Sequence, residues 1–515
     1  MSALISIGVK ETPWHPLRDH IVIGKDILEL LSSSMYIDPM TIYREYVQNA
    51  TDAIDDAKVA GQLAGDGEIS ISIDQSERTI TIRDNGLGLP HDEFLQRMTA
   101  FGGSTKRGTT ARGFRGVGRL AGIGYCQELI FRSRTARDAQ VSELRWDCRK
   151  LKTILRSSER DHDLASAVAH VVSTRAISAR DYPARFFEVE LHGIIRHKND
   201  QLLNPAAVRD YLGQVAPVPF SVEFPFKDQI VAHLREHVRL GDVKITIGDE
   251  PEPITRPHGT GVVYSPEETD PFTTVDLITI PDNDGNTAAL GWIAHHGYIG
   301  GLPAKSPIRG LRFRAGNIQV GDDRLLEDLF PEPRFNGWSV GEIHVVDHRI
   351  LPNGRRDHFE QNVHFNNILT HLVPPARDVA RRCRTSSIER KWVREFELGE
   401  GRIKEYASIL KQGALNRNDR KRTIEQIRAL LDGLGLIVNR GLLDIDIAKQ
   451  LRGRLEKLER EVERLFKREP NSTPLDNLPP RQKRAYEHMI GLIYECSANQ
   501  TVARILVDKI LARLK

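Results

Sequence analysis

The sequence has few cysteines and no long apolar run, and each absence excludes classes of protein. Cys126, Cys148, Cys383 and Cys496 are far apart and form no CxxC pair. This spacing argues against a zinc site and a disulfide framework, and it fits a reducing cytoplasm. No segment approaches the roughly 18 apolar residues that span a bilayer, and no basic region precedes an apolar run at the N-terminus. We therefore expect a cytoplasmic protein with no membrane partner.

The sequence also has little net charge for its size. A formal charge of +3 over 515 residues gives no electrostatic reason to expect nucleic acid or an anionic membrane as the main partner. Local basic patches are compatible with this balance. The chain exceeds the roughly 250 to 300 residues at which a single core stops growing, so we expect two to four domains.

An acid, an amide and a second acid share one face of a predicted helix. The pattern predicts helix from about residue 25 to 60, interrupted near Pro39. Glu45, Asn49 and Asp52 are three or four residues apart and so project together. Glu45 could accept a proton from water, and Asn49 could hold Mg²⁺ against phosphates. On an amphipathic helix, residues of these types usually form a solvated face instead.

A glycine-containing turn follows the first predicted strands. Residues 68–74 and 78–83 alternate apolar and polar side chains and should pair as a hairpin with one buried face. The second strand runs into Asp84, Gly86 and Gly88, and a helix from about 92 to 100 comes next. Glycines allow close approach of a ligand, and a buried carboxylate can accept a hydrogen bond from an exocyclic amino group such as that of adenine.

The segment from Gly102 to Gly124 is rich in glycine, basic and hydroxyl residues, which suits a loop that closes over an anion. Its candidate phosphate cradle consists of Gly113, Phe114, Arg115, Gly116, Val117 and Gly118. Upstream, Ser104, Thr105 and Lys106 could add hydroxyls and a cation. No βαβ strand immediately precedes the cradle, so it is not a dinucleotide fingerprint, and no Walker A loop is present here.

The remaining sequence predicts an α/β region followed by helices. Strands are expected at 128–133 and 186–191, and a separate α/β domain at 202–372 should contain strands 243–247, 290–296 and 341–346. Beyond Pro374 the pattern is helical and charged. An apolar seam from Ala448 to Leu465 fits a coiled coil, a helical hairpin or a bundle helix. A proline-rich linker at 469–480 precedes one final helix at about 482–514.

Taken in order, these motifs resemble those of the GHKL ATPases, the superfamily of gyrase, HtpG-type chaperones, histidine kinases and MutL. The resemblance rests on Arg44-Glu45-x3-Asn49-Ala-x-Asp52, then Asp84 to Gly88, Ser104 to Lys106 and Gly113 to Gly118. It implies a Bergerat ATP-binding fold with a lid over the nucleotide. It also implies Glu45 as the general base, Asn49 as the Mg²⁺ ligand, Asp84 as the adenine reader, and Gly113 to Gly118 as the phosphate-binding lid.

Within the superfamily, residues 28–56 are most similar to HtpG-type chaperones, and residues 345–362 resemble their middle-domain stretch with a phosphate-sensing arginine. Arg356 is its counterpart by position in that pattern. Some features depart from the chaperones. The sequences at 113–116 and 129–135 are closer to those of MutL. A threonine that such ATPases often carry on a late strand is missing from 186–191. Lys305 is an alternative to Arg356 as the middle-domain cation.

We therefore predict a multidomain α/β protein with three parts: a Bergerat-type ATP-binding α/β sandwich (1–200), a middle α/β domain (201–373) and a helical C-terminal region (374–515). The favoured function is an ATP- and Mg²⁺-dependent conformational machine that dimerises and clamps a protein client. The alternative is a MutL-like or MORC-like clamp on DNA. A histidine kinase is disfavoured, because only His15 and His20 precede Glu45.

Overall fold

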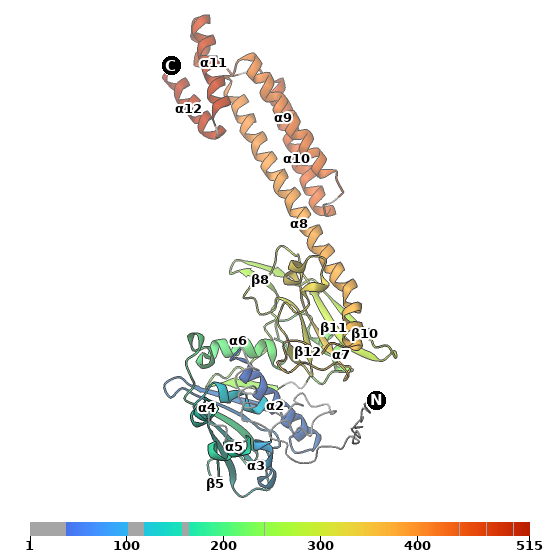
Figure 1. Ribbon diagram of the computed structural model, residues 1–515. Helices are drawn as coiled ribbons and strands as arrows, with labels where there is room; N and C mark the ends of the chain where they lie inside the picture. Colours follow the sequence, from blue (N-terminus) through green and yellow to red (C-terminus); the bar gives the residue numbers. More distant parts are fainter. Residues whose placement is uncertain are drawn as a thin grey trace, which may run out of the picture. The chain divides into compact units, whose positions relative to one another are not determined.

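The computed structural model describes residues 38–100, 118–156, 164–240, 243–441, 443–469, 471–497 and 499–514, with the backbone alone at Lys198. The chain divides into two compact units (Figure 1). The first comprises residues 1–297 and 301–377 and is α/β, and the second comprises residues 298–300 and 378–515 and is helical where it is described. The predicted multidomain α/β class is confirmed. The division at residues 200/201 and 373/374 stays a prediction.

A seven-stranded sheet forms the N-terminal part of the first unit, in the order β5-β4-β3-β6-β2-β1-β7. Its strands are β1 (Gly67–Asp74), β2 (Thr79–Asp84), β3 (Glu128–Arg134), β4 (Val141–Asp147), β5 (Val172–Ile177), β6 (Phe186–His192) and β7 (Val243–Ile247). The predicted hairpin is confirmed, because β1 and β2 pair antiparallel with Ile71 opposite Ile82. Both isoleucines are buried, as the alternating pattern required.

Helices pack on one face of this sheet, so the core is the layer between helices and strands. It contains Ile54 from a helix and Ile69, Phe131 and Trp146 from strands. On β3, Arg132 alternates with the buried Phe131 and pairs with Glu143 and Glu188 of the neighbouring strands. The helical elements of this part are α2 (Thr41–Val59), α3 (His91–Thr99), η2 (Gly118–Gly124), α4 (Cys148–Arg156), α5 (Leu164–Val171), η3 (Lys198–Leu203) and α6 (Pro205–Val215).

One strand lies in a different sheet from the one we predicted. We assigned residues 243–247 to the middle domain, but β7 pairs in parallel with β1 and extends the N-terminal sheet. The reason is long-range pairing, which the local period-two pattern does not specify. The segment Gly118–Gly124, which we expected to be part of a loop, is a short 3₁₀ helix.

The middle of the chain forms a five-stranded sheet in the order β10-β11-β14-β12-β13, with a separate two-stranded pair, β8 and β9. The strands predicted at 290–296 and 341–346 are β11 and β14, and they pair antiparallel. The elements are α7 (Lys227–Arg235), β8 (Gly261–Ser265), β9 (Glu268–Pro271), β10 (Thr274–Pro281), β11 (Thr287–His295), β12 (Gly310–Ala315), β13 (Ile318–Val320), η4 (Glu327–Leu329), η5 (Pro333–Trp338) and β14 (Val340–Val345).

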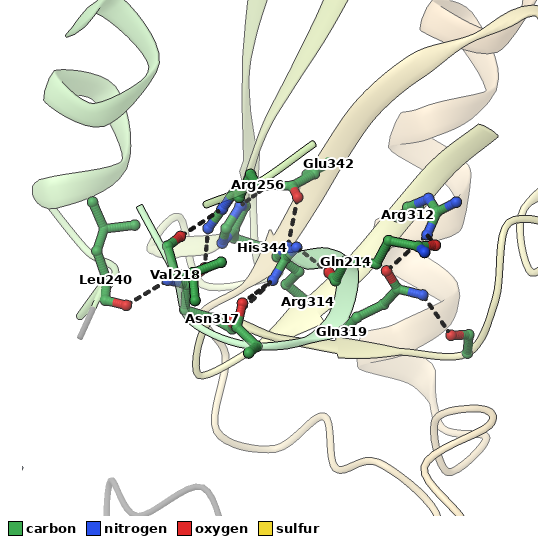
Figure 2. A network of polar contacts seen from close by, with 12 residues as sticks. Gln214, Val218, Leu240, Arg256, Arg312, Arg314, Asn317, Gln319, Glu342 and His344 are labelled. Atoms are coloured by element: carbon green, nitrogen blue, oxygen red, sulfur yellow. Dashed lines mark hydrogen bonds and ion pairs between the residues drawn. The ribbon is translucent and has the colours of Figure 1, made fainter. Parts of the chain in front are cut away.

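A buried ionic network joins α6 to this second sheet (Figure 2). Glu342 on β14 pairs with both Arg256 and Arg314, and all three side chains are buried. Arg314 also donates to the carbonyls of Ala216, at 3.3 Å, and Gln214. Because burial and the neighbouring arginines disfavour its charged form, the pKa of His344 beside Glu342 falls to about 4. The network fixes the end of α6 against the sheet.

The helical region starts earlier and ends differently than predicted. Helix α8 (Val363–Gln412) begins well before Pro374 and continues through Pro374 and Pro375. The predicted final helix is two helices, α11 (Pro480–Cys496) and α12 (Gln500–Arg513). The other helical elements are α9 (Arg417–Val438), α10 (Ile445–Lys467) and η6 (Pro474–Asn477).

In the second unit, α9 and α10 lie alongside the second half of α8 (Figure 1). The seam on α10 is buried against them at Leu451, Leu455, Leu458, Val462 and Leu465. This arrangement matches the predicted bundle or hairpin helix. Within the described ranges, no helix is both long and apolar enough to cross a bilayer.

Candidate active site

Helix α2 carries the predicted acid-amide-acid face, and most of that face is buried. Glu45 is 6% exposed and Asp52 is 3% exposed, while Asn49 is half-buried. A solvated surface would leave both carboxylates in water, so that interpretation is wrong. In the described part of the chain, the Asn49 side chain has no hydrogen-bond partner, which leaves its amide oxygen available.

Gly118 lies directly against the Glu45 carboxylate. A β-carbon added at Gly118 would come within 2.3 Å of Oε2 of Glu45, so a larger residue there would displace the carboxylate. Tyr46 fixes this contact from the next position on α2. Its hydroxyl donates to the carbonyl of Arg119, at 3.1 Å, and accepts from the backbone N–H of Gly122, at 2.9 Å. The first residues of η2 are therefore held to the helix that carries Glu45.

Asp84 ends β2 and turns back toward the far end of α2. Its Oδ1 accepts the backbone N–H of Gly86 at 2.8 Å, and the N–H of Leu87 donates to the carbonyl of Ala53 at 3.2 Å. A β-carbon at Gly86 would meet Ala53 at 2.7 Å. Gly88 has φ +69 and packs on the carbonyl of Arg134, so a side chain there would be both strained and blocked.

Burial changes the chemistry of Asp84. The side chain is 5% exposed, and loss of solvation raises its pKa from 3.8 to about 7, although the Gly86 N–H opposes the shift. A carboxyl group with this pKa either accepts or donates a hydrogen bond near neutral pH. It is suited to a polar group of a buried ligand.

The two glycine contacts mark two points on α2. Gly118 touches Glu45 and Gly86 touches Ala53, eight residues further along, so the contacts are about 12 Å apart along the helix axis. That separation is on the scale of a nucleoside triphosphate. A ligand lying along α2 could reach Asp84 at one end and Glu45 at the other.

Arg356 reaches Glu45 from the segment between β14 and α8. Its Nε lies 3.3 Å from Oε1 of Glu45. The Arg356 backbone has φ +57, a left-handed conformation that a non-glycine residue adopts only when its surroundings impose it. Two backbone bonds hold it there: its N–H donates to Asn353 at 3.1 Å, and its carbonyl accepts from Gly321 at 2.9 Å.

Arg44 of α2 makes a second contact with the segment that carries Arg356. Its Nη2 donates to the carbonyl of Arg355 at 3.0 Å, and the side chain is buried. Further along the segment, Phe359 stacks on Phe365 of α8 and packs edge-on against Phe313 of β12. The cation at Glu45 is therefore presented by an anchored segment.

Lys305, the rival cation, is placed differently. It lies in the turn between β11 and β12 and is exposed, with no ion pair to any residue that the structure describes. Of the two candidates, Arg356 is the one that contacts Glu45.

Asn49 is the residue that could hold Mg²⁺. Among the described residues, no cluster of three or more His, Cys, Asp or Glu side chains could hold a metal without help. A magnesium ion bound through one amide oxygen, waters and substrate phosphates does not require such a cluster. The half-buried Asn49 amide, one turn from Glu45, fits that mode.

Several predicted ligands lie outside the described residues: Ser104, Thr105, Lys106, Gly113, Phe114, Arg115, Gly116 and Val117. Two contributors were missed from the sequence. Tyr46 and Arg44 act through contacts with Gly122, Arg119 and Arg355, which are distant in the chain. Arg44 stood beside the base in the motif, but nothing local indicated its carbonyl partner.

Comparison with known proteins defines the class of this part of the chain. Residues 39–174 match the family of histidine kinase-, DNA gyrase B- and HSP90-like ATPases. The N-terminal part is thus a GHKL-type ATPase domain, as its motifs indicated.

Among curated proteins the chain is similar to the chaperone protein HtpG. It is 32% identical to HtpG of Salinispora arenicola over 114 residues, which are 21% of this chain and 17% of that protein. It is 32% identical to HtpG of Bordetella pertussis over 145 residues, 24% of this chain and 22% of that protein. With HtpG of Serratia proteamaculans it shares 24% over 225 residues, 40% of this chain. These matches span between about a sixth and a third of the relatives' length.

Proposed function

We propose that the chain binds and hydrolyses ATP on α2, with Glu45 as the general base. The observation that carries the proposal is the surroundings of Glu45: a buried carboxylate with a glycine against one oxygen and an arginine beside the other. The glycine lets the backbone pack against the carboxylate without displacing it, and the arginine supplies positive charge where phosphate charge develops. The GHKL family match supports ATP as that substrate.

In this proposal each residue has one task. The Asp84 carboxylate accepts a hydrogen bond from the adenine amino group, and Gly86 keeps the backbone close to the base. Glu45 takes a proton from the attacking water as the bond to the γ-phosphate breaks. Arg356 donates to a γ-phosphate oxygen and stabilises the charge that accumulates there. Mg²⁺ held by Asn49 would neutralise charge on the phosphate oxygens when bound.

The likeness to HtpG supports a slow conformational machine that acts on a protein client. Because Arg356 and Glu45 are 311 positions apart, a nucleotide that Arg356 contacts beside Glu45 would couple the site to the middle of the chain. Closure of the phosphate-binding lid, Gly113 to Gly118, belongs to this proposal, as do homodimerisation and a cytoplasmic location. The DNA-clamp alternative has one observation in its favour, the positive net charge of residues 378–515.

The test is ATP turnover by the purified chain. Phosphate release should require Mg²⁺, stop when EDTA is added, and resume when Mg²⁺ is restored. Tight ATP binding without turnover under all these conditions would show a nucleotide-binding module instead of an ATPase.

A further inference from the structure

The small net charge of the chain hides a strong separation of charge between its two parts. Of the 73 basic and 70 acidic residues, residues 378–515 hold 30 and 20, which is a net charge of +10. The first 377 residues hold the remaining 43 and 50, a net charge of −7. An asymmetry of this kind points to an anionic partner for the basic part.

The positive charge is ordered on α10. Five basic side chains recur along the helix with a helical period, and we call them the basic stripe: Lys449, Lys457, Arg460, Arg464 and Lys467. At about 100° per residue they fall within an arc of about 80°, opposite the apolar seam. All five are exposed, whereas Leu455, Leu458 and the other seam residues are buried.

Asp446 lies in the same arc one turn before the basic stripe begins, but no acidic residue lies in that arc between Lys449 and Lys467. Glu456, Glu459 and Glu463 lie along one flank, and Glu461, on the other flank, pairs with Lys411 of α8 at 3.0 Å. Within the part of the chain that the structure describes, the stripe's own ion pair is Lys467 with Glu463, at 3.8 Å between two exposed groups. Such an exposed pair is weak, and Lys467 can readily exchange Glu463 for another anion.

The shape of the basic stripe fits a duplex backbone better than a membrane. It runs from Lys449 to Lys467, about 27 Å along a helix held in place by its buried seam. A helix that binds a bilayer inserts an apolar face, but the apolar face of α10 is used inside the bundle. Duplex nucleic acid offers a dense row of phosphates, and Lys and Arg bind these without reading sequence.

We propose that the basic stripe on α10 binds the phosphate backbone of duplex nucleic acid, independently of base sequence. The inference goes beyond the proposed ATPase and does not depend on it, because binding to α10 can be measured without nucleotide. It assigns a partner class to the helical region.

The experiment uses the full chain and a fluorescent 30-base-pair DNA, with anisotropy measured between 50 and 200 mM salt. The test variant is Lys457→Glu/Arg460→Glu/Arg464→Glu. The matched control, Arg481→Glu/Arg484→Glu/Lys509→Glu, changes net charge equally at exposed positions of α11 and α12. A third variant, Lys457→Gln/Arg460→Gln/Arg464→Gln, removes charge without adding acid. Circular dichroism and ATP turnover of each variant show whether it is folded.

We expect the wild type to bind with an affinity that falls with salt, and the test variant to bind at least tenfold more weakly. Its slope of log affinity against log salt should shrink by about 3, since each phosphate contact contributes about 0.9. The Gln variant should lose affinity in the same direction, and the control should change less than threefold. Absence of salt-dependent binding by the wild type, or equal losses in test and control variants, would overturn the proposal. Equal salt-dependent binding to anionic vesicles would overturn the assignment to nucleic acid.

Discussion

Arg356 Nε lies 3.3 Å from Oε1 of Glu45, although 311 positions separate the two residues in the chain. The contact brings a cation from the segment before α8 to a carboxylate near the start of α2. Arg44 reinforces it by holding the carbonyl of Arg355. In the proposed ATPase this relationship makes catalysis depend on two distant parts of the first unit.

Arg356→Ala should therefore lower ATP turnover by about 10²- to 10³-fold, the usual cost of removing a donor to transition-state charge. Nucleotide affinity should change much less. Arg356→Lys should restore part of the rate, since a point charge replaces the guanidinium. Lys305→Ala is the control and should keep turnover within twofold. Loss of turnover in Lys305→Ala alone would transfer the role to that residue.

Asp84 should make ATP binding depend on pH. Its pKa of about 7 means that the carboxylate must be ionised to accept from adenine, so ATP affinity should rise up to about pH 7 and then level off. Titration calorimetry from pH 5.5 to 8.5 measures this. Asp84→Asn should abolish binding at every pH.

The same group affects stability with the opposite sign. Because folding raises the pKa of Asp84, its favourable contribution is present below pH 3.8 and is lost as pH rises to about 7. Without nucleotide at pH 8, Asp84→Asn should unfold at a higher temperature than the wild type. A lower melting temperature would show that the ionised carboxylate is well solvated or paired.

Gly118→Ala should displace Glu45, because the new methyl group would overlap its Oε2. We expect a loss of ATP turnover of at least tenfold with little loss of thermal stability, since the contact is with the end of one side chain. Gly65→Ala is a matched control, as nothing lies within 4 Å of its added β-carbon. If Gly118→Ala hydrolyses ATP normally, Glu45 is not confined by this glycine.

Glu342→Gln should destabilise the protein by about 3 to 5 kcal/mol, because Arg256 and Arg314 would keep their charge without a buried counter-ion. Urea unfolding of the first unit measures the loss. Glu250→Gln breaks an exposed pair with Arg209 and should cost at most about 1 kcal/mol. Equal effects of the two changes would mean that the buried network contributes little.

The sequence was informative where function depends on local pattern. The β1–β2 hairpin, α2 and the seam of α10 followed from periodicity, and the GHKL motifs identified the ATPase domain. Long-range relations could not be predicted in the same way. Nothing local in residues 243–247 indicates pairing with β1, and nothing in Tyr46 indicates Gly122. Pro374 and Pro375 usually end a helix, but α8 continues through both, with Leu372 and Ala376 on either side of them buried.

The most direct measurement compares ATP binding and phosphate release in the wild type and in Glu45→Ala. Calorimetry gives the affinity, and single-turnover phosphate release gives the chemical step. If Glu45 is the general base, the variant should bind ATP within a few-fold of the wild type and lose at least 10²-fold in the rate of release. Phosphate release at the wild-type rate by Glu45→Ala would contradict the account.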